Sequence, residues 1–74
     1  MNISVELFGQ LLPGSPRRQT LELAPRTTVR EAAHQLGLTL EEIGLVTING
    51  VQSELEDVVP PKSRLCFFPY LSGG

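Results

Sequence analysis

The chain has 74 residues, of which 41% are hydrophobic and 19% charged, and its formal net charge is −2. These values are typical of one small globular domain with a single core. They exclude the strongly basic face that nucleic-acid binding requires. No apolar run approaches the roughly 18 residues of a membrane-spanning helix, and a single cysteine cannot form an internal disulfide. We therefore expect a cytoplasmic protein that binds neither nucleic acid nor membrane.

The first two predicted elements are β-strands. Residues 3–7 alternate strictly between apolar and polar side chains, which places the three apolar ones on one buried face. A segment rich in glycine and proline follows and predicts a loop. Residues 19–23 alternate again, so we expect a second, antiparallel strand that buries Leu21 and Leu23.

The next segment carries helix signals. Thr28 and Glu31 have the spacing of a capping box, in which each side chain satisfies a free backbone N–H. Apolar residues then recur at helical spacing up to residue 36, and Gly37 stands where a left-handed C-cap is needed. The same cap spacing recurs in residues 39–44 and predicts one short helical turn that a glycine closes.

The last third of the chain predicts further strands. Residues 45–48 form the third strand, and Asn49-Gly50 is a strong hairpin signal because both residues tolerate positive φ. A short edge strand and a loop with two inward apolar residues should follow. Residues 64–68 form the final strand, which Pro69 ends.

The order of these elements predicts the fold. The first and last strands have the strongest β patterns, and a short chain must pack its one long helix across its one sheet. We predict an α+β fold, a ubiquitin-like β-grasp roll, with a mixed sheet of four to five strands and one main helix packed across it. The N- and C-terminal strands should lie parallel in its centre. The domain should span residues 1–68, and residues 69–74 should form a flexible C-terminal tail ending in Gly-Gly.

Four segments together carry a resemblance to a known family. They read VELFGQL at the start, TTVREAAHQL in the helix, VTING at the hairpin and CFFPYLSGG at the end. The whole chain resembles the small sulfur carriers of cofactor biosynthesis, and FFP followed by SGG looks like the small subunit of molybdopterin synthase more than its thiamine-pathway relative. One departure is Pro60-Pro61-Lys62-Ser63, where such carriers commonly have a Gly-Asp turn. Two prolines should make this loop stiffer.

The resemblance implies the following function. An E1-like enzyme adenylates the C-terminal carboxylate of Gly74, using ATP and Mg²⁺ that it holds itself, and sulfur from a donor such as a cysteine desulfurase or rhodanese system replaces AMP. The resulting thiocarboxylate supplies sulfur for the dithiolene of molybdopterin within a complex with the large synthase subunit. By this reading the chain binds no cofactor and is not an enzyme by itself.

The terminal glycines suit this chemistry. Glycine has no Cβ, so another backbone can approach it closely, and Gly73 and Gly74 could thread a narrow channel. The six residues from Pro69 to Gly74 reach about 20 Å when extended. That length would carry the carboxylate into the active site of a second protein.

A docking surface is expected beside the tail. If Leu65 and Phe67 face the core, alternation turns their neighbours to the opposite face of the sheet, where apolar side chains favour partner binding. The alternative is that Phe68 folds over the sheet edge as ordinary core. The expected partner-binding residues are Leu45, Thr47, Cys66, Phe68, Pro69, Leu71 and Ser72.

Other candidate residues favour structural interpretations. His34 should have a structural role on the helix, either at the surface or half-buried. Cys66 should pack, because no base in the sequence would lower the pKa of its thiol. Arg17 and Arg18 should be solvated in a loop, with contact to an acidic partner as the alternative. No cluster has metal-ligand spacing.

Several functions stay open at this point. The sulfur could go to a pterin, a thiazole or a tRNA base, and the finished cofactor could hold molybdenum or tungsten. A protein modifier joined to target lysines through Gly74 would use the same fold and tail. A plain interaction domain with an accidental Gly-Gly is the third possibility.

Overall fold

The computed structural model describes residues 1–70. Four predicted site residues, Leu71, Ser72, Gly73 and Gly74, lie outside this range. The elements within it are β1 (Asn2–Leu7), β2 (Arg18–Glu22), α1 (Val29–Leu36), the 3-10 turn η1 (Leu40–Glu42), β3 (Ile43–Ile48), β4 (Val51–Gln52) and β5 (Arg64–Pro69).

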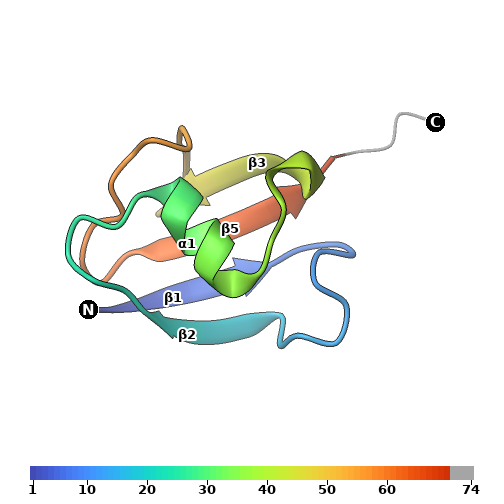
Figure 1. Ribbon diagram of the computed structural model, residues 1–74, viewed down its shortest axis with the longest axis horizontal. Helices are drawn as coiled ribbons and strands as arrows, with labels where there is room; N and C mark the ends of the chain where they lie inside the picture. The colour runs from blue at the N-terminus through green and yellow to red at the C-terminus, as the bar shows by residue number, and fades with distance from the viewer. Residues whose placement is uncertain (71–74) are drawn as a thin grey trace.

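The strands form one mixed sheet in the order β2-β1-β5-β3-β4. β1 and β5 run parallel in the middle, with Val5 opposite Leu65 and Leu7 opposite Phe67. The other neighbouring strands are antiparallel. The N-terminus and the end of β5 therefore lie at opposite ends of the sheet (Figure 1). The predicted parallel pair and the β-grasp arrangement are confirmed.

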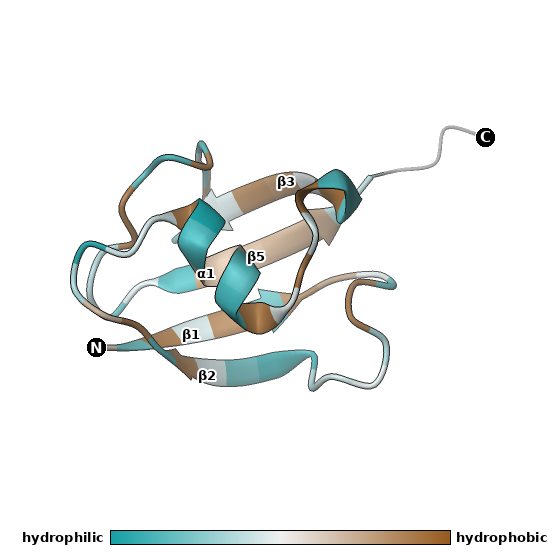
Figure 2. Ribbon diagram, in the orientation of Figure 1, coloured by the Kyte–Doolittle hydropathy of each residue, from teal (hydrophilic) through white to brown (hydrophobic). Residues whose placement is uncertain are grey.

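The core lies between α1 and one face of the sheet (Figure 1). The helix contributes Val29, Ala32 and Ala33, all fully buried, and the two alanines let the helix backbone approach the sheet closely. The outward face of α1 is hydrophilic, whereas apolar residues recur in the strands that it crosses (Figure 2). The sheet side of the core includes Ile3, Val5, Leu7, Val46, Leu65 and Phe67.

The second strand is partly as expected. Leu23 is buried, as predicted, although it lies just past the end of β2. Leu21 is only half-buried and packs at the margin of the core. β2 is an edge strand, so a side chain on its inner face has core on one flank only.

Both ends of α1 are capped as the sequence predicts. The Thr28 hydroxyl accepts a bond from the Glu31 backbone N–H at 3.2 Å, and the Glu31 carboxylate accepts one from the Thr28 backbone N–H at 2.9 Å. Gly37 takes the left-handed conformation with φ of 95°. The hydrogen bonds from Thr28 lower the pKa of the Glu31 carboxyl, the backbone N–H having the larger effect.

The connection from β4 to β5 also holds the start of the helix. The backbone N–H groups of Val29 and Arg30 donate to the carbonyls of Asp57 and Leu55, each at 2.9 Å. The Arg30 guanidinium pairs with the Glu56 carboxylate in the same loop. Helix N–H groups that have no partner within the helix are thus satisfied by a loop distant in sequence.

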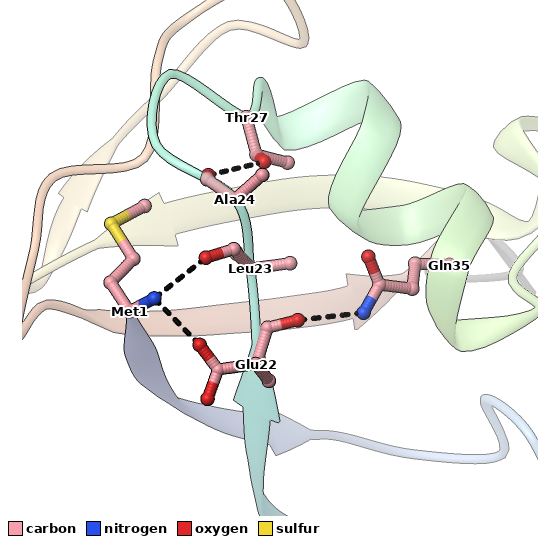
Figure 3. A network of polar contacts seen from close by, with 6 residues as sticks. All are labelled: Met1, Glu22, Leu23, Ala24, Thr27 and Gln35. Atoms are coloured by element: carbon pink, nitrogen blue, oxygen red, sulfur yellow. Dashed lines mark hydrogen bonds and ion pairs between the residues drawn. The ribbon is translucent and has the colours of Figure 1, made fainter.

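A small polar network joins β1, β2 and α1 (Figure 3). The Met1 amino group donates to the Glu22 carboxylate at 2.7 Å and to the Leu23 carbonyl at 2.8 Å. The Gln35 side-chain amide donates to the Glu22 carbonyl at 2.8 Å. The end of β2 is therefore held both to the neighbouring strand and to the helix above it.

The region around the hairpin differs from expectation at one end. Asn49 and Gly50 have φ of 51° and 84°, as the hairpin prediction requires. Gly44 was expected to close the short helical turn, and this is wrong: Ile43 is the C-cap of η1, and Gly44 lies inside β3. The strand begins earlier than predicted because Ile43 is buried and pairs with Pro69.

Candidate functional site

An apolar hollow lies where β5 ends. It has a volume of about 500 Å³ and is built from the segment just after β1, the start of β3 and the end of β5. Its position matters because the chain leaves the sheet here toward its final residues. The lining residues are Phe8, Gly9, Gly44, Leu45, Phe68, Pro69 and Tyr70.

A stacked aromatic pair forms part of this hollow. The rings of Phe8 and Phe68 lie 4.4 Å apart between centroids, with 11° between their planes. Both side chains are half-buried, and neither belongs to the core or to the residues packed at its margin. Phe67, the next residue in the chain, is fully buried. Phe68 thus points to the face opposite the core, as alternation predicted.

Exposed apolar side chains border the pair. Leu45 is 36% exposed and Tyr70 is 65% exposed. Leu45 lies opposite Phe68 in the β3–β5 register. Apolar side chains gathered on an outer face are typical of an interaction surface. We call Phe8, Leu45, Phe68 and Tyr70 the docking face.

Cys66 was expected to pack and also to contribute to the partner-binding face, and its burial fits the first expectation and contradicts the second. Its side chain is only 3% exposed, although it lies outside the core cluster. β5 is the central strand, and Cys66 has Glu6 of β1 on one side and Thr47 of β3 on the other. A residue on the central strand has a neighbouring strand on both sides, which limits its access to solvent. Its packing role fits the structure, and its predicted contact with a partner does not.

The structure brings some predicted site residues together and separates others. Leu45, Phe68 and Pro69 share the hollow. Thr47 is half-buried, lies beside Cys66, and does not line the hollow. Sequence reasoning missed Phe8, yet the parallel pairing of Leu7 with Phe67 places the next residues, Phe8 and Phe68, side by side.

Two glycines lie against the end of β5: Gly44 against the backbone of Pro69 and Tyr70, and Gly9 against the ring of Pro69. A Cβ built on Gly44 would lie 2.8 Å from the Pro69 carbonyl oxygen and 2.9 Å from the Tyr70 Cα. A Cβ built on Gly9 would lie 2.6 Å from the Pro69 Cγ. Real Cβ atoms essentially never approach so closely. These contacts could not be predicted from the sequence because they depend on the strand register.

Arg17 holds the β1–β2 loop together. Its guanidinium donates to the carbonyl oxygens of Gly9 at 3.0 Å and Leu12 at 2.7 Å, and also to those of Leu11 and Ser15. The expectation of a solvated side chain is wrong for Arg17, since backbone carbonyls occupy its donors. Arg18 was also expected in the loop and is instead the first residue of β2, although its side chain does extend into solvent, 3.5 Å from the Glu6 carboxylate.

Residues 1–70 contain no group of three or more His, Cys, Asp or Glu side chains that could hold a metal ion. His34 is exposed on α1. It lines a second, larger hollow of about 790 Å³ that shares no residue with the first. No helix in the described part of the chain is long and apolar enough to cross a membrane.

Comparisons with known proteins identify the class of fold. No family model and no curated protein matches the chain. Among solved structures, it is similar to SAMP1 from Haloferax volcanii, with a TM-score of 0.80 and 24% identity over the whole of both chains. A second structure of the H. volcanii small archaeal modifier protein 1 gives 0.76 and 22%, covering 95% of this chain and 98% of that one.

A more distant likeness is to Urm1 from Trypanosoma brucei, with a TM-score of 0.66 and 18% identity over 99% of this chain and 95% of that one. At these identities the likeness concerns the fold. The chain has the ubiquitin-like β-grasp fold.

Proposed function

We propose that the chain is a sulfur carrier whose C-terminal carboxylate, on Gly74, is adenylated by an E1-like enzyme and converted to a thiocarboxylate. The observation that carries this proposal is the docking face at the end of β5, directly before the residues that lead to Gly-Gly. A partner held on that face would stand next to the start of the tail.

Distance supports the same arrangement. Five residues, from Tyr70 to Gly74, follow β5. Fully extended, they span roughly 17 Å at 3.3–3.6 Å per residue. That length would reach from a docked body into a buried active site of the partner. A docked carrier would also present its carboxylate at a high effective concentration.

The chemistry divides between the chain and its partners. A Gly74 carboxylate oxygen bonds to the α-phosphorus of ATP and releases pyrophosphate, which gives the acyl carbon a good leaving group. A persulfide donor, such as a cysteine desulfurase or rhodanese system, then forms the C–S bond as the C–O bond to AMP breaks. Reductive cleavage of the S–S bond by a thiol leaves the thiocarboxylate. The activating enzyme supplies ATP and Mg²⁺, and the chain supplies the reacting carboxylate.

We further propose that the sulfur serves the dithiolene of molybdopterin, with this chain as the small subunit of the synthase. The segments FFP and SGG support this assignment. Thiocarboxylated chain, mixed with the large subunit and its pterin precursor, should then yield the dithiolene. Carriers for thiamine or tRNA thiolation are the alternatives, and transfer to a thiazole or tRNA instead would identify one of them.

A protein modifier is the second candidate. Its support is the likeness to a protein described as a small archaeal modifier. A modifier would form the same adenylate but pass the acyl group to a lysine of a target protein.

ATP–pyrophosphate exchange with the cognate activating enzyme tests the shared first step. Deleting Gly74 shortens the arm by about 3.3–3.6 Å, and a shift near 1 Å can cost about 100-fold in rate. The deletion should therefore abolish exchange while leaving the melting temperature unchanged. Adding one alanine after Gly74 should also abolish exchange, because the carboxylate moves past the site and gains a Cβ. Full exchange by the deletion variant would overturn both the carrier and the modifier.

A further inference from the structure

We propose that Gly9 and Gly44 form a backbone collar around Pro69 and Tyr70 that sets the direction in which the chain leaves the sheet. For its effect on activation, this inference rests on the proposed function. The collar itself is a property of the described structure and is testable without any partner.

Gly44 supplies one side of the collar. Its φ lies outside the left-handed region, so its own backbone conformation does not require glycine. The neighbouring backbone does require glycine at this position. A Cβ at Gly44 would lie 2.8 Å from the Pro69 carbonyl oxygen and 2.9 Å from the Tyr70 backbone nitrogen. The β3–β5 register also shifts between Ile43 and Leu45 at this point. These atoms are backbone, so relief of the clash would require β3 and the end of β5 to move apart.

Gly9 supplies the other side. β1 and β3 flank β5, so the two glycines approach Pro69 from opposite neighbours in the sheet. A Cβ at Gly9 would lie 2.6 Å from the Pro69 Cγ and 3.2 Å from its Cδ. The Arg17 guanidinium donates to the Gly9 carbonyl and fixes this loop against movement.

Glycines elsewhere in the described chain lack such neighbours. A Cβ on Gly14 or Gly50 would meet nothing within 4 Å. Both have positive φ, so their conformation alone accounts for glycine there. Gly44 differs from them because another backbone approaches it closely. Gly9 has positive φ as they do, but it also contacts the rigid ring of Pro69.

The consequence is a fixed starting point for the final residues. Pro69 has a fixed φ and is held on both sides, so the Tyr70 backbone has a defined position relative to the sheet. When an activating enzyme binds the docking face, the tail that carries the carboxylate would then start from a fixed position relative to that enzyme. Where reacting groups must be held in near-attack geometry, a displacement of about 1 Å can lower the rate by about 100-fold.

Gly44→Ala tests the collar directly. Residual dipolar couplings of backbone amides should change at Tyr70 and stay unchanged at Leu7, which lies in β1. An unchanged Tyr70 coupling in a folded variant would overturn the collar. This measurement needs no activating enzyme. It therefore tests whether the collar exists even if the wild-type chain shows no pyrophosphate exchange and the proposed function fails.

Exchange kinetics of the same variant test the effect on activation. We expect kcat to fall by about 10- to 100-fold, with a smaller rise in KM, because the variant keeps every side chain of the docking face but displaces Tyr70, which belongs to it. A loss confined to KM would assign Gly44 to docking, and wild-type kcat would show that the exit direction is unimportant. Either result overturns the functional half of the inference.

Gly9→Ala and Gly14→Ala form a matched pair that remains informative if Gly44→Ala does not fold. Both positions have left-handed φ, 60° and 88°, so both variants carry that strain. Contact with Pro69 exists only for Gly9. Gly9→Ala should lower kcat and Gly14→Ala should not. Pro69→Ala removes Cγ and Cδ, so adding Gly9→Ala to that variant should lower kcat no further. If Gly9→Ala lowers kcat equally with and without Pro69, the part of Gly9 in the collar is overturned.

Discussion

Two adjacent residues, Phe67 and Phe68, have opposite environments. Alternation along β5 turns Phe67 into the core beside Leu7 and Val46, where it is fully buried. Phe68 lies on the other face and stacks on Phe8. Identical side chains therefore allow a direct comparison of a core role with a surface role.

Alanine substitutions should separate these roles. Phe67→Ala should lower the free energy of unfolding by about 3–5 kcal/mol, because it leaves a cavity in the core. Phe68→Ala should cost less, roughly 1 kcal/mol for the lost aromatic stack, but weaken binding to the activating enzyme by about 2 kcal/mol or more. Urea unfolding and calorimetric titration measure the two effects. A Phe68→Ala protein that unfolds like Phe67→Ala and binds normally would contradict the docking face.

Cys66 illustrates the limit of reasoning from alternation. The pattern correctly separates Cys66 from the core cluster but says nothing of the side chains beside it. Its register partners, Glu6 and Thr47, come from two other strands. A prediction of accessibility needs the pairing of strands, and one strand's sequence does not contain it.

The buried thiol should be unreactive in the folded chain. Alkylation of Cys66 by iodoacetamide, followed by mass spectrometry, should be slow in native buffer and fast in urea, since the covering side chains must move away first. Cys66→Ala would serve as the control for labelling elsewhere. Rapid labelling of the native chain would show that the outer face of β5 is open at this position.

At the scale of elements, α1 depends on the rest of the fold. Its eight residues are too few for a stable isolated helix. The spacing of Thr28 and Glu31 allowed its start to be predicted. The carbonyls of Leu55 and Asp57, which satisfy its first N–H groups, could not be predicted because that loop has no regular pattern.

The capping carboxylate should make stability depend on pH. Hydrogen bonds from Thr28 lower the pKa of Glu31 below its ordinary value of 4.5 in the folded chain. Its contribution is therefore complete above 4.5 and is lost as the pH falls toward the folded pKa, because the unfolded chain takes up the proton first. Wild-type chain should be more stable than Glu31→Gln at neutral pH, and this difference should shrink in acid.

Urea unfolding at several pH values measures that difference. Thr28→Ala is the matched variant, since it removes the hydroxyl donor but keeps the backbone N–H that has the larger effect on the pKa. It should retain part of the pH dependence. A difference between wild type and Glu31→Gln that is constant down to strong acid would show that the carboxylate charge is unimportant for the cap.

At the scale of the whole molecule, the sheet order explains where the site lies. β5 is both the central strand and the last one, so the chain leaves the sheet from between β1 and β3. The hollow at this point is lined by Phe8 and Gly9, which follow β1, and by Gly44 and Leu45 of β3. The fold and the parallel pair could be predicted from periodicity and turns. The hollow at the end of β5 could not be predicted, because it joins three segments that are distant in sequence.

The form of the protein in its native cell should distinguish carrier from modifier. A carrier should be found with its intact mass raised by the difference between one sulfur and one oxygen atom, located on a C-terminal peptide ending at Gly74. The Gly74 deletion should lack this form, because it has no correctly placed carboxylate to activate. Lys62, the single lysine, is exposed beside two prolines and offers one site for chain formation. Branched remnants of this chain that end at Gly74, attached to lysines of other proteins and found without the sulfur form, would instead identify a modifier. A C-terminus beyond Gly74 in the mature protein would contradict both.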